Sequence, residues 1–421
     1  MPIGKPTPNH MASERSPSAQ DPNYLLHLPP AAERPSAFSP LIKDVIQIMR
    51  KVYLDNAATT QIRPEVVEAM VQVLSEDFGN PSSSHSFGRH AKSLTELSRN
   101  SVAKQLNCTA QEIIFTSGGT EADNWILTSA VKDLKVKRII SSKIEHHAVL
   151  HTIAQLQKEF EISVDYVKVN PDGQIDITSL TDLLSDQKPT LVSLMHINNE
   201  IGSETDLMQI GAICRDYNAL FHSDTIQSVG KTQFDLQQIP IDFIVGSAHK
   251  FHGPKGIGFA FVRKGLAMHP MIFGGEQEKG LRAGTESVHN IVGMAKALEL
   301  SNFNLHEEQK HISDLKEYTM AQIATIFPDA KINGANSFYN MVNVCFPFSE
   351  DKTAMILFNL DMKGIAVSRG SACQSGSLRP SHVLAEILSE DDLKKPSLRI
   401  SFSHYNTKDD IDYLIEVLAG I

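Results

Sequence analysis

Cysteine is scarce in this chain, and the few cysteines present are widely separated. The four are Cys108, Cys214, Cys345 and Cys373, and no two of them form a C-x-x-C pair. This pattern excludes the dense disulfide framework of small secreted domains. It is more typical of a reducing compartment, so we expect a cytoplasmic protein.

Long apolar runs and an excess of positive charge are also missing. The sequence has no run of about 18 apolar residues, the length that a membrane-spanning helix needs. With 39 Lys and Arg against 49 Asp and Glu, the net charge is -10. This charge argues against a broad nucleic-acid-binding face, because phosphate binding needs clustered basic residues. We therefore expect a soluble globular protein, long enough at 421 residues for a large domain and a smaller one.

The first 48 residues lack hydrophobic periodicity and are rich in Pro, Ser and Ala. A segment of this composition buries too little apolar surface to offset the entropy lost on ordering, so we expect residues 1–48 to be a disordered extension. The segment has neither the apolar core of a secretory signal nor the Arg-rich pattern of a transit peptide. An upstream extension before a true start at Met49 is the alternative. The folded part is expected to begin with a strand at 52–55.

Short apolar segments alternate with helix-length segments from Arg63 onward. The expected strands are 112–116, 138–141, 190–195, 219–222, 241–245 and 258–262. Strands separated by helices predict βαβ units and a mainly parallel sheet flanked by helices, with ligands at the carboxyl ends of the strands. After about residue 300 the order becomes helix, strands, helix, with strands expected at 341–346 and 397–402. The fold class is therefore α/β, with a smaller α+β domain.

Lys250 lies directly after one of the expected buried strands. It ends the segment 247–250, which stands between the strand 241–245 and a glycine-rich turn at 251–258. A lysine held there by a stiff backbone faces a pocket, and desolvation lowers its pKa, as Schiff-base chemistry with a carbonyl cofactor requires. A solvated lysine without a special role is the alternative.

Two more strand ends carry groups that complement such a lysine. The strand 112–116 opens into a Ser-Gly-Gly-Thr turn at 117–120 and then a helix, whose free N–H groups form a phosphate site. Asp224 follows another strand, one strand before Lys250. A carboxylate for the pyridinium nitrogen, a lysine for the aldehyde and a helix N-terminus for the phosphate are the parts that hold pyridoxal phosphate. Taken singly, the turn has a plain capped turn as its alternative, and Asp224 a helix N-cap.

Histidines and an amide follow two other expected strands. His146 and His147 come after one strand, and His147 and His151 have the i, i+4 spacing of a metal pair. No third ligand is evident nearby, and a histidine at a strand end equally covers a ring, shuttles a proton or has a structural role. Asn199 follows another strand and places an amide at the same edge of the sheet.

Cys373 is the cysteine that lies in a flexible setting. It is centred in a run of Gly, Ser and Ala at 367–377, which predicts an exposed, mobile loop where a thiolate acts as a nucleophile. The other three cysteines fit the inert, buried role better. Arg399, in the expected strand 397–402, can grip a carboxylate with two hydrogen bonds, with a surface ion pair as the alternative.

Taken together, these motifs resemble the cysteine desulfurases of the NifS/IscS type, class-V pyridoxal-phosphate enzymes of fold type I. The similarity runs from about Tyr53 to Leu418. Its motifs are YLDNAATT at 53–60, GNPSS at 79–83, TSGGTE at 116–121, NNEIG at 198–202, HK at 249–250, GPKG at 253–256, RAGT at 282–285 and GSAC at 370–373. The longer cysteine loop resembles the IscS branch rather than the SufS branch.

The resemblance implies roles for single residues. Lys250 holds pyridoxal 5'-phosphate covalently and moves the α-proton, His146 stacks on the cofactor ring, and Cys373 is the sulfur-accepting nucleophile. The implied cofactor-binding residues are Gly119, Thr120, His146, Asn199, Asp224, Gln227, Ser247, His249, Lys250 and Thr285, of which Asp224 pairs with the ring nitrogen, Gln227 with the ring hydroxyl and Thr285 with the neighbouring subunit's phosphate. Asn199 and Arg399 hold the substrate carboxylate.

The resemblance also implies the organisation and the reaction. A large cofactor-binding domain covers 62–304, and a small domain, 49–61 with 305–421, carries the cysteine loop. The chain is expected to form a homodimer that converts L-cysteine to L-alanine and leaves a persulfide on Cys373. The sulfur then passes to an acceptor protein for iron-sulfur cluster assembly or tRNA thiolation. No resident metal is implied, although Cys373 is a candidate transient iron-sulfur ligand.

Two departures from the family pattern and two rival functions stay open. Ala248 stands where the family usually has Gly, and Arg369 stands where it often has Ser and adds positive charge near the cysteine. One rival is a selenocysteine lyase or another class-V enzyme in which Cys373 is incidental. The other is a binding or scaffold protein that keeps the fold without catalysis.

Overall fold

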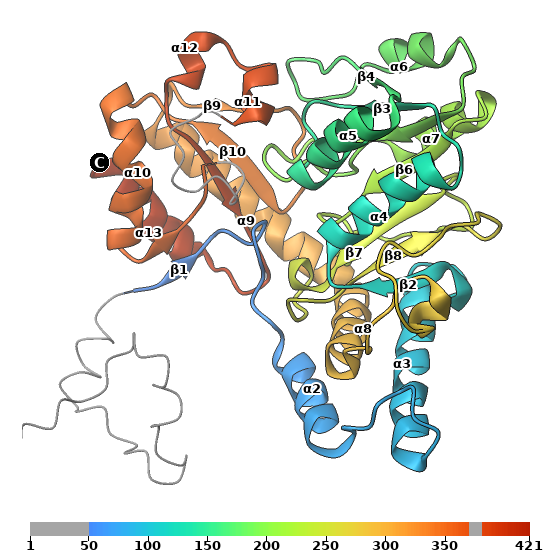
Figure 1. The fold of residues 1–421 in the computed structure, drawn as a ribbon. Coiled ribbons are helices and arrows are strands. Elements are labelled where there is room, and N and C mark those ends of the chain that lie inside the picture. Colours follow the sequence, from blue (N-terminus) through green and yellow to red (C-terminus); the bar gives the residue numbers. More distant parts are fainter. Residues whose placement is uncertain (1–49, 370–380) are drawn as a thin grey trace, which may run out of the picture. The chain divides into compact units, whose positions relative to one another are not determined.

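A seven-stranded sheet is the largest element of the computed structural model, which describes residues 50–369 and 381–421. Its strands are, in spatial order, β2 (Ile113–Thr116), β8 (Gly258–Val262), β7 (Phe243–Ser247), β6 (Leu220–Asp224), β5 (Thr190–Ser193), β3 (Arg138–Ser141) and β4 (Ser163–Tyr166). β8 runs antiparallel to both of its neighbours, and the remaining pairs are parallel. The prediction of a mainly parallel sheet is confirmed (Figure 1).

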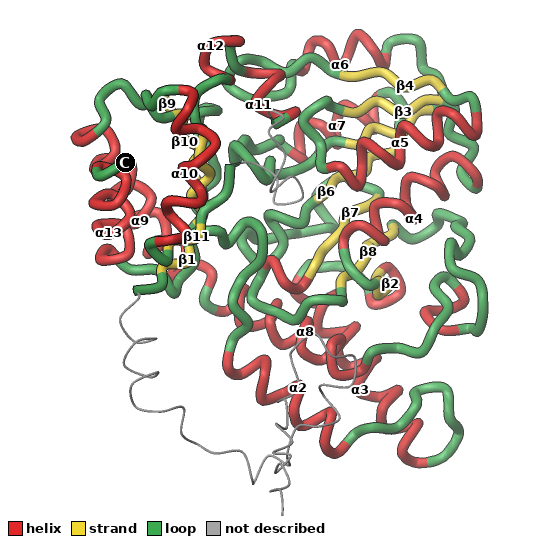
Figure 2. Tube along the Cα trace, turned by 60° about the vertical axis from the view of Figure 1, so that its left-hand side comes forward, coloured by secondary structure: helices red, strands yellow, loops and turns green. Residues whose placement is uncertain are grey.

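Side chains along each strand alternate between two apolar cores, one on each face of this sheet. On β2, Ile113 and Phe115 belong to one core, whereas Ile114 belongs to the other. The helices that close the first core are α2 (Pro64–Glu76), α3 (Ser86–Gln105), α6 (Ile177–Leu184), α7 (Leu207–Asp216) and α8 (Val288–Phe303). The second core is closed by α4 (Gly119–Lys132) and α5 (His147–Phe160), which lie along the row of yellow strands in Figure 2.

A separate apolar core lies among the C-terminal elements. It is built on an antiparallel sheet of β12 (Ser397–Ser401), β10 (Met341–Cys345) and β9 (Lys331–Ile332) and on the parallel pair β1 (Val52–Tyr53) and β11 (Ile365–Ala366). The helices of this region are α9 (Leu305–Ile326), α10 (Glu350–Met362), α11 (His382–Ile387), α12 (Glu390–Leu393) and α13 (Lys408–Ala419). The separate core supports our division into a large domain (62–304) and a small domain (49–61 with 305–421), which stays a proposal.

The expected strands are found, with differences at their ends. β3 and β8 have the predicted limits, and β6 extends two residues further than predicted, so that Asp224 is its last residue instead of following it. The cause is pairing, because Asp224 lies opposite Val245 of β7. β4 was not predicted, since this edge strand is short and its side chains are exposed or only partly buried.

In the described part of the chain, three short 3₁₀ helices are also present: η2 (Ala110–Glu112), η3 (Ala248–Lys250) and η4 (Gln277–Gly280). Residues 51–421 form one unit, and the expected disordered extension, residues 1–48, lies outside the described residues. Within the described part of the chain, no helix is both long and apolar enough to cross a membrane.

Candidate active site

A pocket of about 250 Å³ opens at the carboxyl ends of the parallel strands. Ten of the predicted site residues line it: Gly119, Thr120, His146, Asn199, Asp224, Gln227, Ser247, His249, Lys250 and Arg399. Four lining residues were not predicted: Ala57, Ala58, Met195 and Ile226. The first two belong to the YLDNAATT motif, which carried a family resemblance but no assigned role.

Lys250 lies at the end of η3, directly after β7, whose five residues are all buried. Its Nζ donates hydrogen bonds to the carbonyl oxygens of Ala57 (2.7 Å) and Ala58 (2.8 Å). The backbone around both partners is fixed, since the Thr60 N–H donates to the carbonyl oxygen of His249 at 2.8 Å. The lysine amine is therefore held at a defined point of the pocket by a segment almost 200 residues earlier in the chain.

Asp224 and His146 form the polar wall beside Lys250. Burial raises the pKa of Asp224, while His146, the Ile226 N–H and Lys250 oppose the rise. Burial also lowers the pKa of His146, and Asp224 opposes that shift. His146 is the N-cap of α5, because its Nδ1 accepts a hydrogen bond from the Ala148 N–H at 3.1 Å. A neutral His146 therefore carries its proton on Nε2.

The N-terminus of α4 forms the end of the pocket where we predicted a phosphate. The helix begins at Gly119, and a Cβ at this position would lie 1.9 Å from Cδ1 of Ile226, so that a larger residue would require the Ile226 side chain to move. Thr120, Ser247 and His249 lie around the same end. Burial and the neighbouring lysines lower the pKa of His249 to about 4. Free helix N–H groups, two hydroxyls and a close-approach glycine fit a phosphate group.

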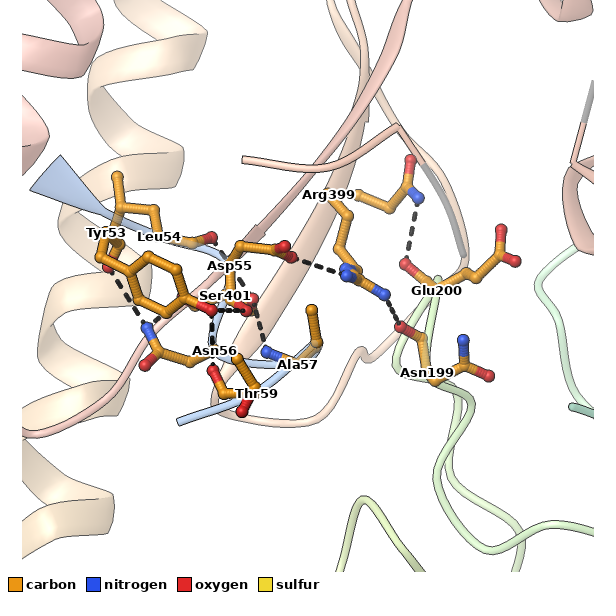
Figure 3. A network of polar contacts seen from close by, with 12 residues as sticks. Tyr53, Leu54, Asp55, Asn56, Ala57, Thr59, Asn199, Glu200, Arg399 and Ser401 are labelled. Atoms are coloured by element: carbon orange, nitrogen blue, oxygen red, sulfur yellow. Dashed lines mark hydrogen bonds and ion pairs between the residues drawn. The ribbon is translucent and has the colours of Figure 1, made fainter. Parts of the chain in front are cut away.

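Arg399 lines the pocket from β12 of the C-terminal sheet. Figure 3 shows its side chain between Asp55 and Asn199. Its side chain is buried, with Nη2 donating to Oδ1 of Asp55 at 2.7 Å and Nη1 donating to the carbonyl oxygen of Asn199 at 2.7 Å. Its Nε has no hydrogen-bond partner among the residues that the structure describes. A buried guanidinium that is fixed from two sides can receive a planar carboxylate.

The predicted nucleophile, Cys373, lies outside the described residues, but the described segments on either side of it contact Arg399, which lines the pocket, or Glu145 and Glu200, which adjoin lining residues in the sequence. On one side, Ser368 pairs with Arg399 through two backbone hydrogen bonds. On the other side, the Ser381 hydroxyl donates to the Glu200 carboxylate, and Nε2 of His382 donates to the carbonyl oxygen of Glu145 at 2.9 Å.

The histidine pair His147 and His151 is joined by a third histidine that sequence spacing did not indicate. The ring centroids of His147 and His151 are 4.9 Å apart, and those of His147 and His382 are 4.6 Å apart. Burial and the neighbouring histidines lower the pKa of His147 to about 4. Within residues 50–369 and 381–421, no group of three or more His, Cys, Asp or Glu side chains is arranged to hold a metal ion.

Thr285 does not line the pocket of its own chain. It is exposed and borders a smaller cavity of about 70 Å³ with Ser117 and Arg282.

The structure accommodates both residues that depart from the family pattern. The Ala248 methyl group is fully buried, and Arg369 is half-buried, which lowers the pKa of its guanidinium.

Two buried acids near Asp224, Asp123 and Glu145, were not recognised as site residues from the sequence. Burial, with Asp224 and Glu145 nearby, raises the pKa of Asp123 well above its usual value. Oδ1 of Asp123 lies 3.3 Å from Nε2 of His222, whose pKa is lowered to about 3 by burial. Burial raises the pKa of Glu145 to about 8, although its Oε1 accepts two hydrogen bonds.

The raised pKa of Glu145 predicts a pH-dependent stability difference. A carboxyl group that keeps its proton in the folded state contributes stability that is fully present below its unfolded pKa, near 4.5, and is lost as pH rises through about 8. Glu145→Gln resembles the neutral acid and does not titrate. We expect the unfolding free energy of the wild type to fall relative to Glu145→Gln between about pH 5 and about pH 9 in denaturant titrations. A difference that does not change with pH would contradict this prediction.

Comparisons with known proteins agree with this geometry. Residues 52–414 match the family Aminotransferase class-V. A cysteine desulfurase IscS of Dictyoglomus turgidum is 43% identical over 378 residues, which cover 88% of this chain and 94% of that protein. A cysteine desulfurase IscS of Methanosarcina thermophila is 40% identical, with 88% of this chain and 92% of that protein covered.

Solved structures give the same result. A NifS-like protein superposes with a TM-score of 0.81 at 35% identity, covering 88% of this chain and 99% of that one. A structure of SspA in complex with cysteine superposes with a TM-score of 0.73 at 31% identity, covering 85% and 100%. The chain therefore belongs to the class-V aminotransferase family and, within it, to the cysteine desulfurases of the NifS/IscS type.

Proposed function

We propose that this protein removes sulfur from L-cysteine, releases L-alanine and carries the sulfur as a persulfide on Cys373. The observation that carries the proposal is the joint position of Lys250, Asp224 and Arg399 in one pocket, beside both segments that lead to Cys373. A non-catalytic scaffold has no need of a fixed lysine amine in such a pocket. The relatives named cysteine desulfurase support the same reaction.

The residues of the pocket fit pyridoxal 5'-phosphate. Lys250 would hold the aldehyde carbon covalently, Asp224 the ring nitrogen and Gln227 the ring oxygen, with His146 over the ring. The phosphate would lie at the N-terminus of α4, beside Thr120, Ser247 and His249. When bound, this cofactor acts as an electron sink for the bonds at the substrate's α-carbon. The fit is supported by the start of α4, whose first residues, Gly119 and Thr120, line this end of the pocket.

Side chains of the protein bind the substrate, move its α-proton and accept its sulfur. Arg399 and Asn199 bind the substrate carboxylate and orient the amino acid, and Lys250 moves the α-proton. The Cys373 thiolate attacks the substrate sulfur, so that a sulfur–sulfur bond forms as the carbon–sulfur bond breaks. The carbon takes up a proton and leaves as alanine, and the persulfide sulfur passes to an acceptor protein docked near residues 370–380. The separated cysteines support a reducing compartment, the cytoplasm, for this thiol chemistry.

We also propose a homodimer in which each subunit supplies Thr285 to the other's phosphate site. The exposure of Thr285 and its place outside its own pocket support this arrangement. We expect the purified protein to sediment as a dimer, and Thr285→Ala to weaken cofactor binding without changing the sedimentation coefficient. A monomer with full activity would contradict the shared site.

The proposed reaction is tested by incubating the purified protein with L-cysteine and a reductant and then measuring sulfide and alanine. Equal amounts of both products are expected, since each turnover releases one sulfur and one alanine. The rival enzyme, a selenocysteine lyase, would release alanine from selenocysteine and little from cysteine.

A further inference from the structure

Lys231 is a buried lysine for which the proposed reaction provides no role. Its side chain is 8% exposed, and its Nζ donates to Oε1 of Gln227 at 3.1 Å. Nε2 of Gln227 in turn donates to the carbonyl oxygen of Ala57 at 2.8 Å, the same oxygen that accepts from Lys250. A chain of hydrogen bonds therefore leads from Lys231 through Gln227 to the position of the Lys250 amine.

These contacts determine which way the Gln227 carboxamide faces. An ammonium group only donates hydrogen bonds, and a carbonyl oxygen only accepts them. If the Gln227 amide were reversed, its NH₂ group would face the Lys231 ammonium, donor against donor, and its oxygen would face the Ala57 carbonyl oxygen, acceptor against acceptor. The amide oxygen is thus kept toward Lys231 and the NH₂ group toward the carbonyl oxygen of Ala57, which also lines the pocket. An anionic acceptor in the pocket would meet N–H donors rather than a carbonyl oxygen.

The backbone of Lys231 is fixed as firmly as its side chain. Its carbonyl oxygen accepts hydrogen bonds from Nε2 of Gln309 at 2.9 Å and from the Tyr339 hydroxyl at 3.1 Å. Gly230, with φ at 73°, lies against Phe251, where a Cβ would come within 2.6 Å of that side chain. The cavity that borders Lys231 has a volume of only about 20 Å³, which leaves room for little more than one water molecule. The Lys231 side chain therefore has little room to move at this site.

The charges around Lys231 leave it without a permanent counter-ion. Burial, with the like charges of Lys250 and Arg399 nearby, lowers the pKa of Lys231 to about 7. His252 and Glu308 border the same cavity, but Glu308 pairs with Arg63, and within the described residues Lys231 forms no ion pair. A buried ammonium is costly unless negative charge is brought near it. The pocket that Gln227 lines is the place where a ligand can supply that charge.

We propose that Lys231 is a positioning residue that orients the Gln227 amide toward the anionic ring oxygen of the bound cofactor and adds a buried positive charge behind it. This inference rests on the proposed function, because it requires pyridoxal 5'-phosphate in the pocket. It assigns to Lys231 an effect on cofactor binding and on the electron density of the cofactor ring, exerted through Gln227 rather than by direct contact.

The test is a double-mutant cycle on the full chain with Lys231→Met, Gln227→Ala and the combined variant. Each apoprotein is titrated with pyridoxal 5'-phosphate, and the dissociation constant and the visible absorption maximum are recorded. We expect Lys231→Met to weaken binding about tenfold, which is about 1.4 kcal/mol, and to shift the absorption maximum in the wild-type background. In the Gln227→Ala background the same substitution should change binding less than about twofold.

Lys316→Met is the matched control. Lys316 is partly buried, burial lowers its pKa to about 8, and its Nζ donates to Ser337 and Phe338, neither of which lines the pocket. This variant should lower the melting temperature without changing the absorption maximum. If Lys231→Met does not fold, Lys231→Gln, which keeps an N–H donor, replaces it in the cycle.

Two outcomes would overturn the inference. Equal tenfold effects of the Lys231 substitution in both backgrounds would show that it acts without Gln227, and an unchanged absorption maximum would show that it does not reach the cofactor ring. If the wild type itself binds no pyridoxal 5'-phosphate, the proposed function fails as well, and the two failures are thereby distinguished.

Discussion

Lys250→Ala is expected to purify without covalently attached cofactor and to desulfurate cysteine at least about 10³-fold more slowly than the wild type. The substitution removes the amine that Ala57 and Ala58 hold in the pocket, and with it both the covalent bond to the cofactor and the base that moves the α-proton. Absorbance spectra and alanine release measure the two losses separately.

Lys264→Ala is the matched control for this loss. Lys264 is exposed just after β8 and does not line the pocket. Its removal should leave cofactor content and turnover unchanged. Borohydride reduction of the wild type, followed by peptide mapping, should label Lys250. Labelling of any other lysine would contradict the assignment of Lys250 as the lysine that binds the cofactor.

The second large effect is expected at Cys373. Cys373→Ser should bind the cofactor as the wild type does and should still change its absorbance when cysteine is added, because Lys250, Asp224 and Arg399 are intact. Alanine production should fall by about 10³-fold or more, since a serine hydroxyl is not a competent nucleophile toward the substrate sulfur. A normal rate of cysteine desulfuration by this variant would favour the lyase alternative.

The other cysteines supply the control. Cys108 is partly buried, and burial with Glu112 nearby raises the pKa of its thiol to about 12, so that it stays protonated and unreactive. Cys108→Ser should therefore retain full activity. A comparable loss in both variants would show that the effect of Cys373→Ser is not specific to the thiolate.

Much of the pocket could be predicted from the sequence because its residues follow strands in the chain. In a parallel sheet the carboxyl ends of neighbouring strands meet at one edge, so Gly119, Asp224 and Lys250, each at or just after the end of an apolar run, had to be close together. Small residues at the start of α4 added the phosphate end. These are local patterns that need no knowledge of distant contacts.

The unpredicted parts depend on contacts between segments far apart in the chain. The Ala57 carbonyl binds a lysine 193 residues away, and Arg399 is paired with Asp55 across 344 residues. Lys231 follows Gln227 by four residues, but its position inside the protein, rather than on the surface, is set by α9 and by Tyr339. No spacing rule distinguishes such a lysine from a solvated one.

The position of sulfur after one turnover tests the account most directly. The wild-type protein is incubated with L-cysteine without reductant, digested, and its peptides are weighed by mass spectrometry. We expect one extra sulfur atom on the peptide that contains Cys373, lost on reduction and absent when cysteine is omitted. Extra sulfur on another cysteine, or sulfide and alanine released with none on Cys373, would contradict the proposed persulfide mechanism.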